Sequence, residues 1–260
     1  MDFAIGSQRV FAGTGGRPFD NSLPTVVLLH GAGMNHTVWA LQARALAHHG
    51  RNVLAIDFPG HGDSAGPALT TIEDLADWLL RALRALNLAR FRLAGHSMGS
   101  LVALETASRA GAACEALALL GFVPEMRVHP DLLGAARSGA HLASELMVAW
   151  GFKVLTGGNT APGVFLPDAA LRLIEQTPAA SLAADLAACD RYAGAAAAAG
   201  VVRCPVLLLS GAQDRMTPAA KADGFAGNFA HGRSIVLRGC GHMLMVEQPV
   251  AVLDSLRTIL

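Results

Sequence analysis

A serine, an aspartate and a histidine lie in three short loops of this chain, where together they could carry out nucleophilic catalysis. Ser97 is the centre of residues 95–99, Gly-His-Ser-Met-Gly, a G-x-S-x-G sequence. Acyl transfer by a serine needs a base that removes the Oγ proton, an acid that orients this base, and N–H donors for the oxyanion. Asp214 and His242 follow Ser97 along the chain and are the candidates for the acid and the base.

The segments on either side of Ser97 give this motif chemical meaning. Residues 91–94 have the pattern of a strand and residues 100–107 the pattern of a helix. A serine on a tight strand-to-helix turn exposes its Oγ above the sheet, and the flanking glycines permit the turn. The N–H of Met98 then lies at a helix N-terminus, where negative charge is favoured. With 28 Gly in the chain the motif also arises by chance, so other segments must support it.

The elements that must position these loops predict an α/β fold. Short apolar strand patterns alternate with helical patterns, which indicates a mostly parallel sheet with helices on both faces. The expected parallel strands are residues 25–29, 53–56, 91–94, 116–120, 206–209 and 234–237, and residues 8–12 are expected to add an antiparallel edge strand. Asp214 and His242 follow the last two strands, so all three side chains can meet at one edge of the sheet. The chain order Ser, Asp, His is the one expected for this architecture.

Three sequence patterns predict where helices begin. Thr70 and Glu73 have the spacing of a capping box. Thr217 and Pro218 predict an N-cap followed by proline at the first helical position, and Pro249 is expected to open the last helix.

The alternation of strands and helices stops between residues 124 and 200. This segment has helical patterns and a loop that contains Gly and Pro, but no strand pattern: the helical patterns cover residues 131–146, 168–175 and 181–191, and the loop covers residues 156–167. An all-helical insertion between two strands predicts a cap over the carboxyl ends of the strands, where open α/β sheets bind ligands. We therefore expect a core made of residues 1–123 and 201–260, with residues 124–200 as the cap.

Several apolar residues of the expected cap are candidates for lining an acyl pocket. Aliphatic and methionine side chains outnumber aromatic ones among them, which favours a flexible aliphatic substrate. The candidates are Met126, Leu142, Met147, Trp150, Phe152 and Phe165.

Composition limits the classes of partner. Lys+Arg and Asp+Glu balance at 20 each, and no basic cluster occurs, which argues against nucleic acid or an anionic surface. The N-terminus has no signal-peptide pattern, and no apolar run reaches the roughly 18 residues that a membrane span needs. The four cysteines lack metal-site spacing and are expected to be reduced thiols, so we predict a cytoplasmic location.

A second oxyanion donor follows the first long strand. Residues 30–33, His-Gly-Ala-Gly, contain glycines that let the backbone approach a substrate oxygen, and the N–H of Ala32 is the candidate donor. Together with residues 57–64 (Asp-Phe-Pro-Gly-His-Gly-Asp-Ser), the Ser97 motif, and the Asp214 and His242 loops, this segment resembles the α/β-hydrolase superfamily. The match is similar to its capped carboxylesterase-like branch, which includes small esterases and pimeloyl-carrier-protein methyl esterases. It covers nearly the whole chain except the cap.

The resemblance implies a role for each of these residues. Ser97 would be the nucleophile, His242 the general base and Asp214 the residue that orients it, with Ala32 and Met98 as the oxyanion hole. It implies hydrolysis of a small-molecule ester through an acyl-enzyme, with no metal or organic cofactor.

Other activities of the superfamily stay open. Haloalkane dehalogenases and epoxide hydrolases use an aspartate nucleophile, whereas this chain has Ser97. Carbon–carbon hydrolases usually carry Asn before the nucleophile and Trp after the catalytic histidine, where this chain has His96 and Met243. Cofactor-free perhydrolases share the triad. A ligand receptor on a hydrolase scaffold is a further alternative, because a scaffold does not prove activity.

Overall fold

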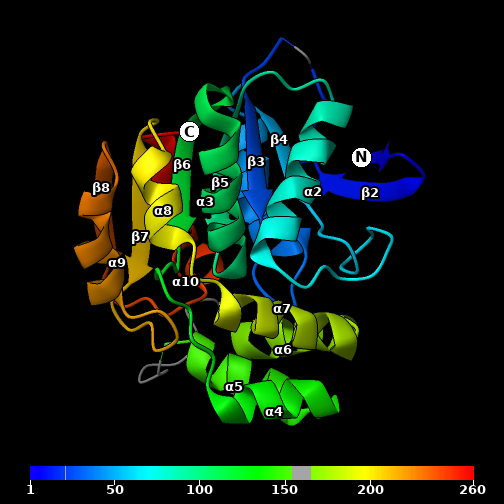
Figure 1. Ribbon diagram of the computed structural model, residues 1–260, viewed down its shortest axis with the longest axis vertical. Helices are drawn as coiled ribbons and strands as arrows, with labels where there is room; N and C mark the ends of the chain where they lie inside the picture. Colours follow the sequence, from blue (N-terminus) through cyan, green and yellow to red (C-terminus); the bar gives the residue numbers. More distant parts are fainter. Residues whose placement is uncertain (21, 154–164) are drawn as a thin grey trace.

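The computed structural model describes residues 1–20, 22–153 and 165–260 (Figure 1). Its centre is an eight-stranded sheet in the order β1-β2-β4-β3-β5-β6-β7-β8. The strands are β1 (Asp2–Ile5), β2 (Gln8–Gly13), β3 (Thr25–Leu29), β4 (Asn52–Ile56), β5 (Phe91–His96), β6 (Cys114–Leu120), β7 (Val206–Gly211) and β8 (Gly232–Leu237). Strands β3 to β8 are parallel, and β1 and β2 form an antiparallel edge. The predicted α/β-hydrolase fold class is therefore confirmed.

Helices cover both faces of this sheet and the carboxyl ends of its strands (Figure 1). They are α1 (Ala40–Ala47), α2 (Ile72–Ala85), α3 (Met98–Ala110), α4 (Pro130–Ser138), α5 (Leu142–Gly151), α6 (Leu166–Gln176), α7 (Ala179–Arg191), α8 (Ala195–Val201), α9 (Ala219–Phe225), α10 (Leu244–Glu247) and α11 (Pro249–Arg257). Side chains of β3 alternate between two cores: Val27 and Leu29 pack with α2 and α3, whereas Val26 and Leu28 pack with α1 and α11. Burial on both faces explains why the strand sequences are continuously apolar.

Two helix boundaries differ from the sequence prediction. The N-cap of α2 is Thr71 and not Thr70: Thr71 has an extended backbone, and its Oγ1 accepts the N–H of Asp74 at 3.0 Å. Residues 131–146 form two helices, because α4 ends at Gly139 with a φ of +67° before α5 begins.

Two expected proline-linked helix starts had different outcomes. Pro249 opens α11 as predicted. Thr217 does not cap α9: this helix begins at Ala219 with Pro218 as its N-cap residue. The Thr217 hydroxyl instead donates to the carboxylate of Asp214.

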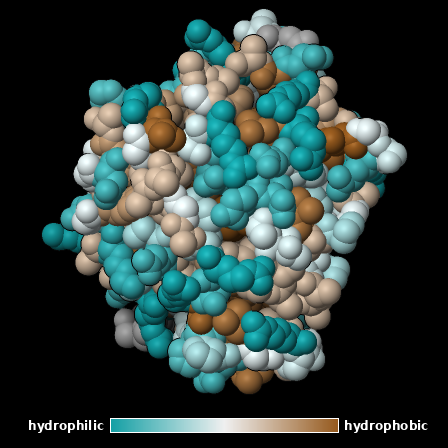
Figure 2. All heavy atoms as spheres, in the orientation of Figure 1, coloured by the Kyte–Doolittle hydropathy of each residue, from teal (hydrophilic) through white to brown (hydrophobic). Residues whose placement is uncertain are grey.

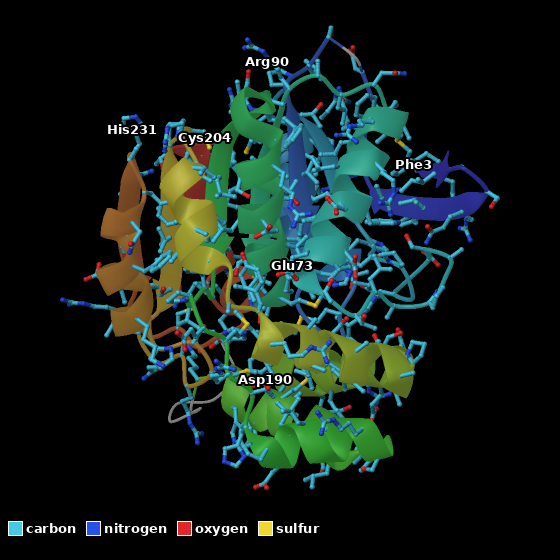
Figure 3. The ribbon with its side chains drawn as sticks, viewed as in Figure 1. Phe3, Glu73, Arg90, Asp190, Cys204 and His231 are labelled. Atoms are coloured by element: carbon cyan, nitrogen blue, oxygen red, sulfur yellow. The ribbon has the colours of Figure 1, made fainter. Side chains whose placement is uncertain are left out.

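Helices α4 to α7 form a separate layer over one end of the strands of the sheet (Figure 1). The amino ends of the strands are marked in Figure 3 by Arg90 just before β5, Cys204 shortly before β7 and His231 just before β8. These residues lie at the end of the sheet opposite the helical layer, which contains Asp190 of α7. The layer therefore covers the carboxyl ends of the strands. The division into a core and a cap of residues 124–200 stays a prediction, and the expected loop 156–167 lies mostly outside the described residues.

On the face shown in Figure 2, hydrophobic residues are scattered among hydrophilic ones rather than gathered in one place. The large exposed ones come from separate elements: Leu41, Leu142, Phe165, Val201, Val236 and Val250. Among the residues that the structure describes, no helix combines the length and the apolar character that crossing a membrane requires.

Candidate active site

The backbone of Ser97 forms a strained turn between β5 and α3. Its φ of 53° and ψ of −121° lie in a region that non-glycine residues rarely adopt. The flanking glycines are required by close contacts: a Cβ on Gly95 would lie 2.0 Å from the carbonyl oxygen of Gly99, and one on Gly99 would lie 2.5 Å from that of His30. The strand–turn–helix context predicted for the G-x-S-x-G motif is thus present.

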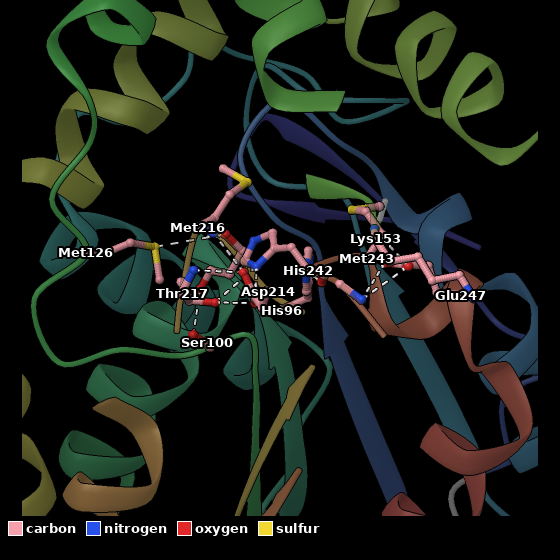
Figure 4. Close-up of polar contacts among 12 residues, drawn as sticks. His96, Ser100, Met126, Lys153, Asp214, Met216, Thr217, His242, Met243 and Glu247 are labelled. Atoms are coloured by element: carbon pink, nitrogen blue, oxygen red, sulfur yellow. Dashed lines mark hydrogen bonds and ion pairs between the residues drawn. The ribbon is translucent and has the colours of Figure 1, made fainter. Parts of the chain in front are cut away.

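Asp214 and His242 form a buried pair beside this turn (Figure 4). The Nδ1 of His242 lies 2.8 Å from Oδ2 of Asp214, to which it donates. Asp214 also accepts from the Thr217 hydroxyl at 2.6 Å, and its Oδ1 accepts the N–H groups of Met216 and Thr217 at 2.9 and 2.8 Å. Both carboxylate oxygens are therefore held in place.

The surroundings of Asp214 favour its ionised form. Burial alone would raise the pKa of this carboxyl, but the neighbouring His242 and the hydrogen bonds from Thr217 outweigh burial and hold the pKa below its ordinary value. A carboxylate fixes the imidazole with its proton on Nδ1 and leaves Nε2 as the basic nitrogen. Thr217 belongs to this arrangement, although its sequence pattern pointed to a helix cap.

The loop that carries His242 is held by buried polar groups from three elements. The backbone N–H of His242 donates to the Gly151 carbonyl of α5 at 2.7 Å, and the His242 carbonyl accepts from Nε2 of His96 at 2.9 Å. The carboxylate of Glu247, in α10, accepts the N–H groups of Gly241 and Met243 at 3.1 and 3.2 Å (Figure 4). Sequence reasoning missed Glu247, because a single acidic residue in a helical pattern gives no signal of such a role.

Ser97 and His242 face the same cavity. A Cβ on Gly121 would lie 2.9 Å from Cε1 of His242, so this glycine gives the imidazole ring the space it occupies. The hydroxyl of Ser97 points towards Sδ of Met126 at 3.9 Å. Among the described residues, the side chains of Ser97 and His242 are not hydrogen-bonded to each other, as is common for catalytic groups before a substrate binds.

The loop after β3 passes directly over Ser97. A Cβ on Gly31 would lie 3.2 Å from Cβ of Ser97, and Ala32 lines the cavity together with Ser97. Within the described part of the chain, the N–H of Ala32 has no hydrogen-bond acceptor. Met98 is the first residue of α3, and such an N–H has no partner inside its own helix. Both expected oxyanion donors are therefore available beside Ser97.

His30 connects this loop to residues 57–64. Its Nδ1 lies 2.9 Å from the Gly31 carbonyl, and its Nε2 accepts the N–H of Phe58 at 3.1 Å. Burial lowers the pKa of His30 to about 4, so the ring is neutral and can accept at Nε2. The buried imidazole of His30 therefore joins residues 30–33 to residues 57–64, two of the segments that resemble the α/β-hydrolase superfamily.

The cavity above Ser97 has a volume of about 530 Å³ and a mainly apolar lining. Three of the six expected pocket residues line it, namely Met126, Met147 and Trp150. The other three do not: Leu142 and Phe165 are exposed, and Phe152 is buried in the hydrophobic core.

The described lining contains basic side chains and no Asp or Glu. Arg127, His129 and Arg215 all contact the cavity, and Arg215 is exposed next to Asp214. Across residues 1–20, 22–153 and 165–260, no group of three or more His, Cys, Asp or Glu side chains is arranged to hold a metal ion.

Comparison with known proteins agrees with this fold. The chain is 27% identical over 256 residues to (E)-2-((N-methylformamido)methylene)succinate hydrolase of Acinetobacter baylyi, covering 89% of this chain and 88% of that protein. It is 34% identical to 2-succinyl-6-hydroxy-2,4-cyclohexadiene-1-carboxylate synthase of Escherichia coli, over 50% of this chain and 49% of that one.

Solved structures show the same architecture. The enol-lactonase of Burkholderia xenovorans superimposes with a TM-score of 0.87 at 24% identity, over 99% of this chain and 98% of that one. An esterase of Thermogutta terrifontis gives a TM-score of 0.83 at 23% identity, over 96% and 92% of the two chains. Residues 26–255 match the model of the alpha/beta hydrolase family, and the chain belongs to that family.

Proposed function

We propose that this protein is a serine hydrolase that cleaves carboxylic esters through a Ser97–His242–Asp214 triad. The observation that carries the proposal is the 2.8 Å pair between His242 and Asp214, which opens into the same cavity as Ser97 on its strained turn. Burial of all three residues and free N–H groups beside Ser97 support it further.

The residues act in the following order in the proposed reaction. His242 removes the Oγ proton of Ser97, which attacks the ester carbonyl, and the N–H groups of Ala32 and Met98 stabilise the oxyanion. His242 then gives its proton to the leaving alcohol. Water deprotonated by His242 next attacks the acyl-enzyme, releasing the acid and restoring Ser97.

The lining of the cavity supports a substrate class within the esters. Its apolar body suits an aliphatic acyl chain, while Arg127 and Arg215 give it a positive rim. A relative of this chain is named as the hydrolase of a succinate derivative, which has carboxylates of its own. We therefore include monoesters of dicarboxylic acids among the expected substrates.

Two observations keep a second activity in view. The aligned relatives include a hydrolase of a methylene succinate, and the same triad serves carbon–carbon hydrolases and perhydrolases. Ester hydrolysis is the better-supported reaction, because Met243 and His96 occupy the positions where carbon–carbon hydrolases usually carry Trp and Asn. A non-catalytic receptor is the remaining alternative.

The first experiment is hydrolysis of p-nitrophenyl esters from acetate to laurate by the wild-type protein and by Ser97→Ala. We expect the substitution to lower kcat by roughly 10⁴–10⁶-fold with an unchanged circular dichroism spectrum, because the nucleophile is lost. Ser108→Ala is the matched control, since the Ser108 hydroxyl donates to the Glu105 carbonyl within α3 and does not line the cavity.

The outcomes separate the alternatives. A Ser97→Ala protein that keeps more than a tenth of the activity would exclude Ser97 as the nucleophile. Labelling of Ser97 by a fluorophosphonate without turnover of any ester would favour the receptor. Turnover only with peroxide, or only of a vinylogous diketone, would replace ester hydrolysis by one of the other reactions.

A further inference from the structure

Helix α7 and the residue at the end of α6 hold both backbone groups of Gly33, which follows Ala32. The N–H of Gly33 donates to Oδ2 of Asp185 at 2.9 Å, and its carbonyl accepts from the Thr177 hydroxyl at 2.9 Å. Asp185 is 152 residues and Thr177 is 144 residues further along the chain. The peptide units on both sides of Gly33 are therefore fixed by the helical layer and not by the sheet.

Gly33 has a backbone conformation that residues with a side chain rarely adopt. Its φ is +65°, and a Cβ there would lie 2.8 Å from Cδ1 of Leu182 on α7. Because Ala32 and Gly33 share a peptide unit, the direction of the Ala32 carbonyl is coupled to the Gly33 N–H. A rotation at Gly33 would move Ala32, whose N–H must point at the oxyanion.

Asp185 is itself held by a buried ion pair. Its Oδ2 lies 2.8 Å from Nε2 of His61, and both side chains are 1% exposed. Nδ1 of His61 lies 3.0 Å from the Pro59 carbonyl. Both ring nitrogens thus face acceptors, which requires a doubly protonated imidazolium, and a cation there fixes the Asp185 carboxylate towards the Gly33 N–H.

We propose that Asp185 and Thr177 are positioning residues for catalysis: they hold Gly33 and so place the Ala32 N–H where it stabilises the oxyanion. This inference rests on the proposed function, since it needs Ala32 to be an oxyanion donor. It assigns the helical layer a part in the chemistry beyond covering the cavity. Removing a donor from an oxyanion hole costs about 10²–10³-fold in kcat, and displacing one costs a share of that.

The test compares Thr177→Val with Thr177→Ser, and adds Asp185→Ala, which removes the acceptor for the Gly33 N–H. Valine matches threonine in shape and removes the hydroxyl, while serine keeps it. We expect Thr177→Val and Asp185→Ala to lower kcat for p-nitrophenyl butyrate by about 10- to 100-fold with KM changed less than about twofold. Thr177→Ser should recover most of the rate. Ser138→Ala is the control, because it removes an exposed hydroxyl of α4 that bonds only within that helix.

A second measurement does not depend on the choice of ester. The rate at which a fluorophosphonate labels Ser97 requires the oxyanion donors, because the phosphonyl oxygen occupies their site. We expect the labelling rate to fall in parallel with kcat in the variants that lose a contact to Gly33. Their melting temperatures are measured alongside, to detect loss of folding. A partly unfolded variant would show fewer labelled molecules at the end of the reaction rather than slower labelling of all of them.

The outcomes keep this inference apart from the proposed function. If the wild-type protein is not labelled at Ser97, the proposed function fails and this role fails with it. If the wild type is labelled and Thr177→Val and Asp185→Ala react within twofold of it, only the positioning role is overturned. Equal losses in Thr177→Val and Thr177→Ser would also overturn it, since the hydroxyl would then be irrelevant.

Discussion

Two buried histidine–aspartate pairs in this molecule have the same 2.8 Å separation and different surroundings. In the first, Nδ1 of His242 donates to Asp214, and the ring reaches the cavity that Ser97 lines. In the second, both nitrogens of His61 face acceptors, and the ring lies between the sheet and α7. Only the first pair has a nitrogen free to accept a proton from a reacting group.

The electrostatic surroundings of the two pairs also differ. Burial would lower the pKa of His61, but the charge of Asp185 and the hydrogen bond to it outweigh burial, and the net shift is upwards. Oδ1 of Asp185 has no partner among the described residues, whereas both oxygens of Asp214 are bonded. The comparison teaches that distance alone does not mark a catalytic pair; a free nitrogen at a cavity does.

Neutralising the two aspartates gives the largest contrast. Asp214→Asn should lower kcat by about 10³–10⁴-fold, because the amide no longer fixes the imidazole tautomer. Asp185→Ala should lower it by about 10- to 100-fold, since it removes the acceptor that holds the Gly33 N–H. Steady-state kinetics of both variants on one p-nitrophenyl ester measures this, and equal losses would remove the distinction between the pairs.

Removing the histidine of the second pair should mainly affect stability. His61→Ala leaves Asp185 buried without its partner cation, and we expect the free energy of unfolding to fall by about 3–5 kcal/mol. His141→Ala is the control, because its pair with Glu175 is exposed and should contribute less than about 1 kcal/mol. Urea denaturation followed by circular dichroism measures both. A His61→Ala protein as stable as the control would show that the buried pair is not a stabilising link.

Removing the positive rim should affect binding of anionic esters. Arg215→Ala should raise KM for the p-nitrophenyl monoester of a dicarboxylic acid by about fivefold, because an exposed charge contact contributes on the order of 1 kcal/mol. The neutral p-nitrophenyl butyrate serves as the internal control, with an unchanged KM. A parallel change for both esters would exclude a carboxylate contact.

Two buried histidines should also make the stability of the protein depend on pH. Burial lowers the pKa of His96 to about 3 and that of His30 to about 4. Below the ordinary histidine pKa of about 6.5 the unfolded chain therefore binds protons that the folded chain does not, and stability falls as the pH falls. Each histidine contributes up to about 1.4 kcal/mol per pH unit over this window.

The variant His96→Gln tests this contribution. Its amide nitrogen can replace the donor from Nε2 to the His242 carbonyl, and it does not titrate in this range. Between pH 6 and pH 4 its unfolding free energy should fall less steeply than that of the wild type, by about one proton's slope. Identical slopes in urea titrations at several pH values would contradict the assigned cause.

Much of the fold followed from local patterns in the sequence. Periodicity located the parallel strands, because a sheet buried on both faces needs continuous apolar segments. The single helix expected over residues 131–146 was wrong because a left-handed Gly139 ends α4. The cap on Thr217 was wrong because its hydroxyl bonds Asp214, three residues earlier in the same loop, and lies 3.1 Å from Nδ1 of His242 in a separate loop.

The sequence by itself determined the turn at Ser97 and the chain order of Asp214 and His242. Gly95 is dictated by its contact with the Gly99 carbonyl four residues on, whereas Gly99 is required by the His30 carbonyl from the loop after β3. Parallel strands send their following loops to one edge. Only the tertiary structure decided that Asp185 and Thr177 meet Gly33, and which pair keeps a nitrogen free. The contacts of Gly33 with Asp185 and Thr177 join residues more than 140 positions apart. They arise from how α6 and α7 pack on the sheet, and they leave no local pattern in the sequence.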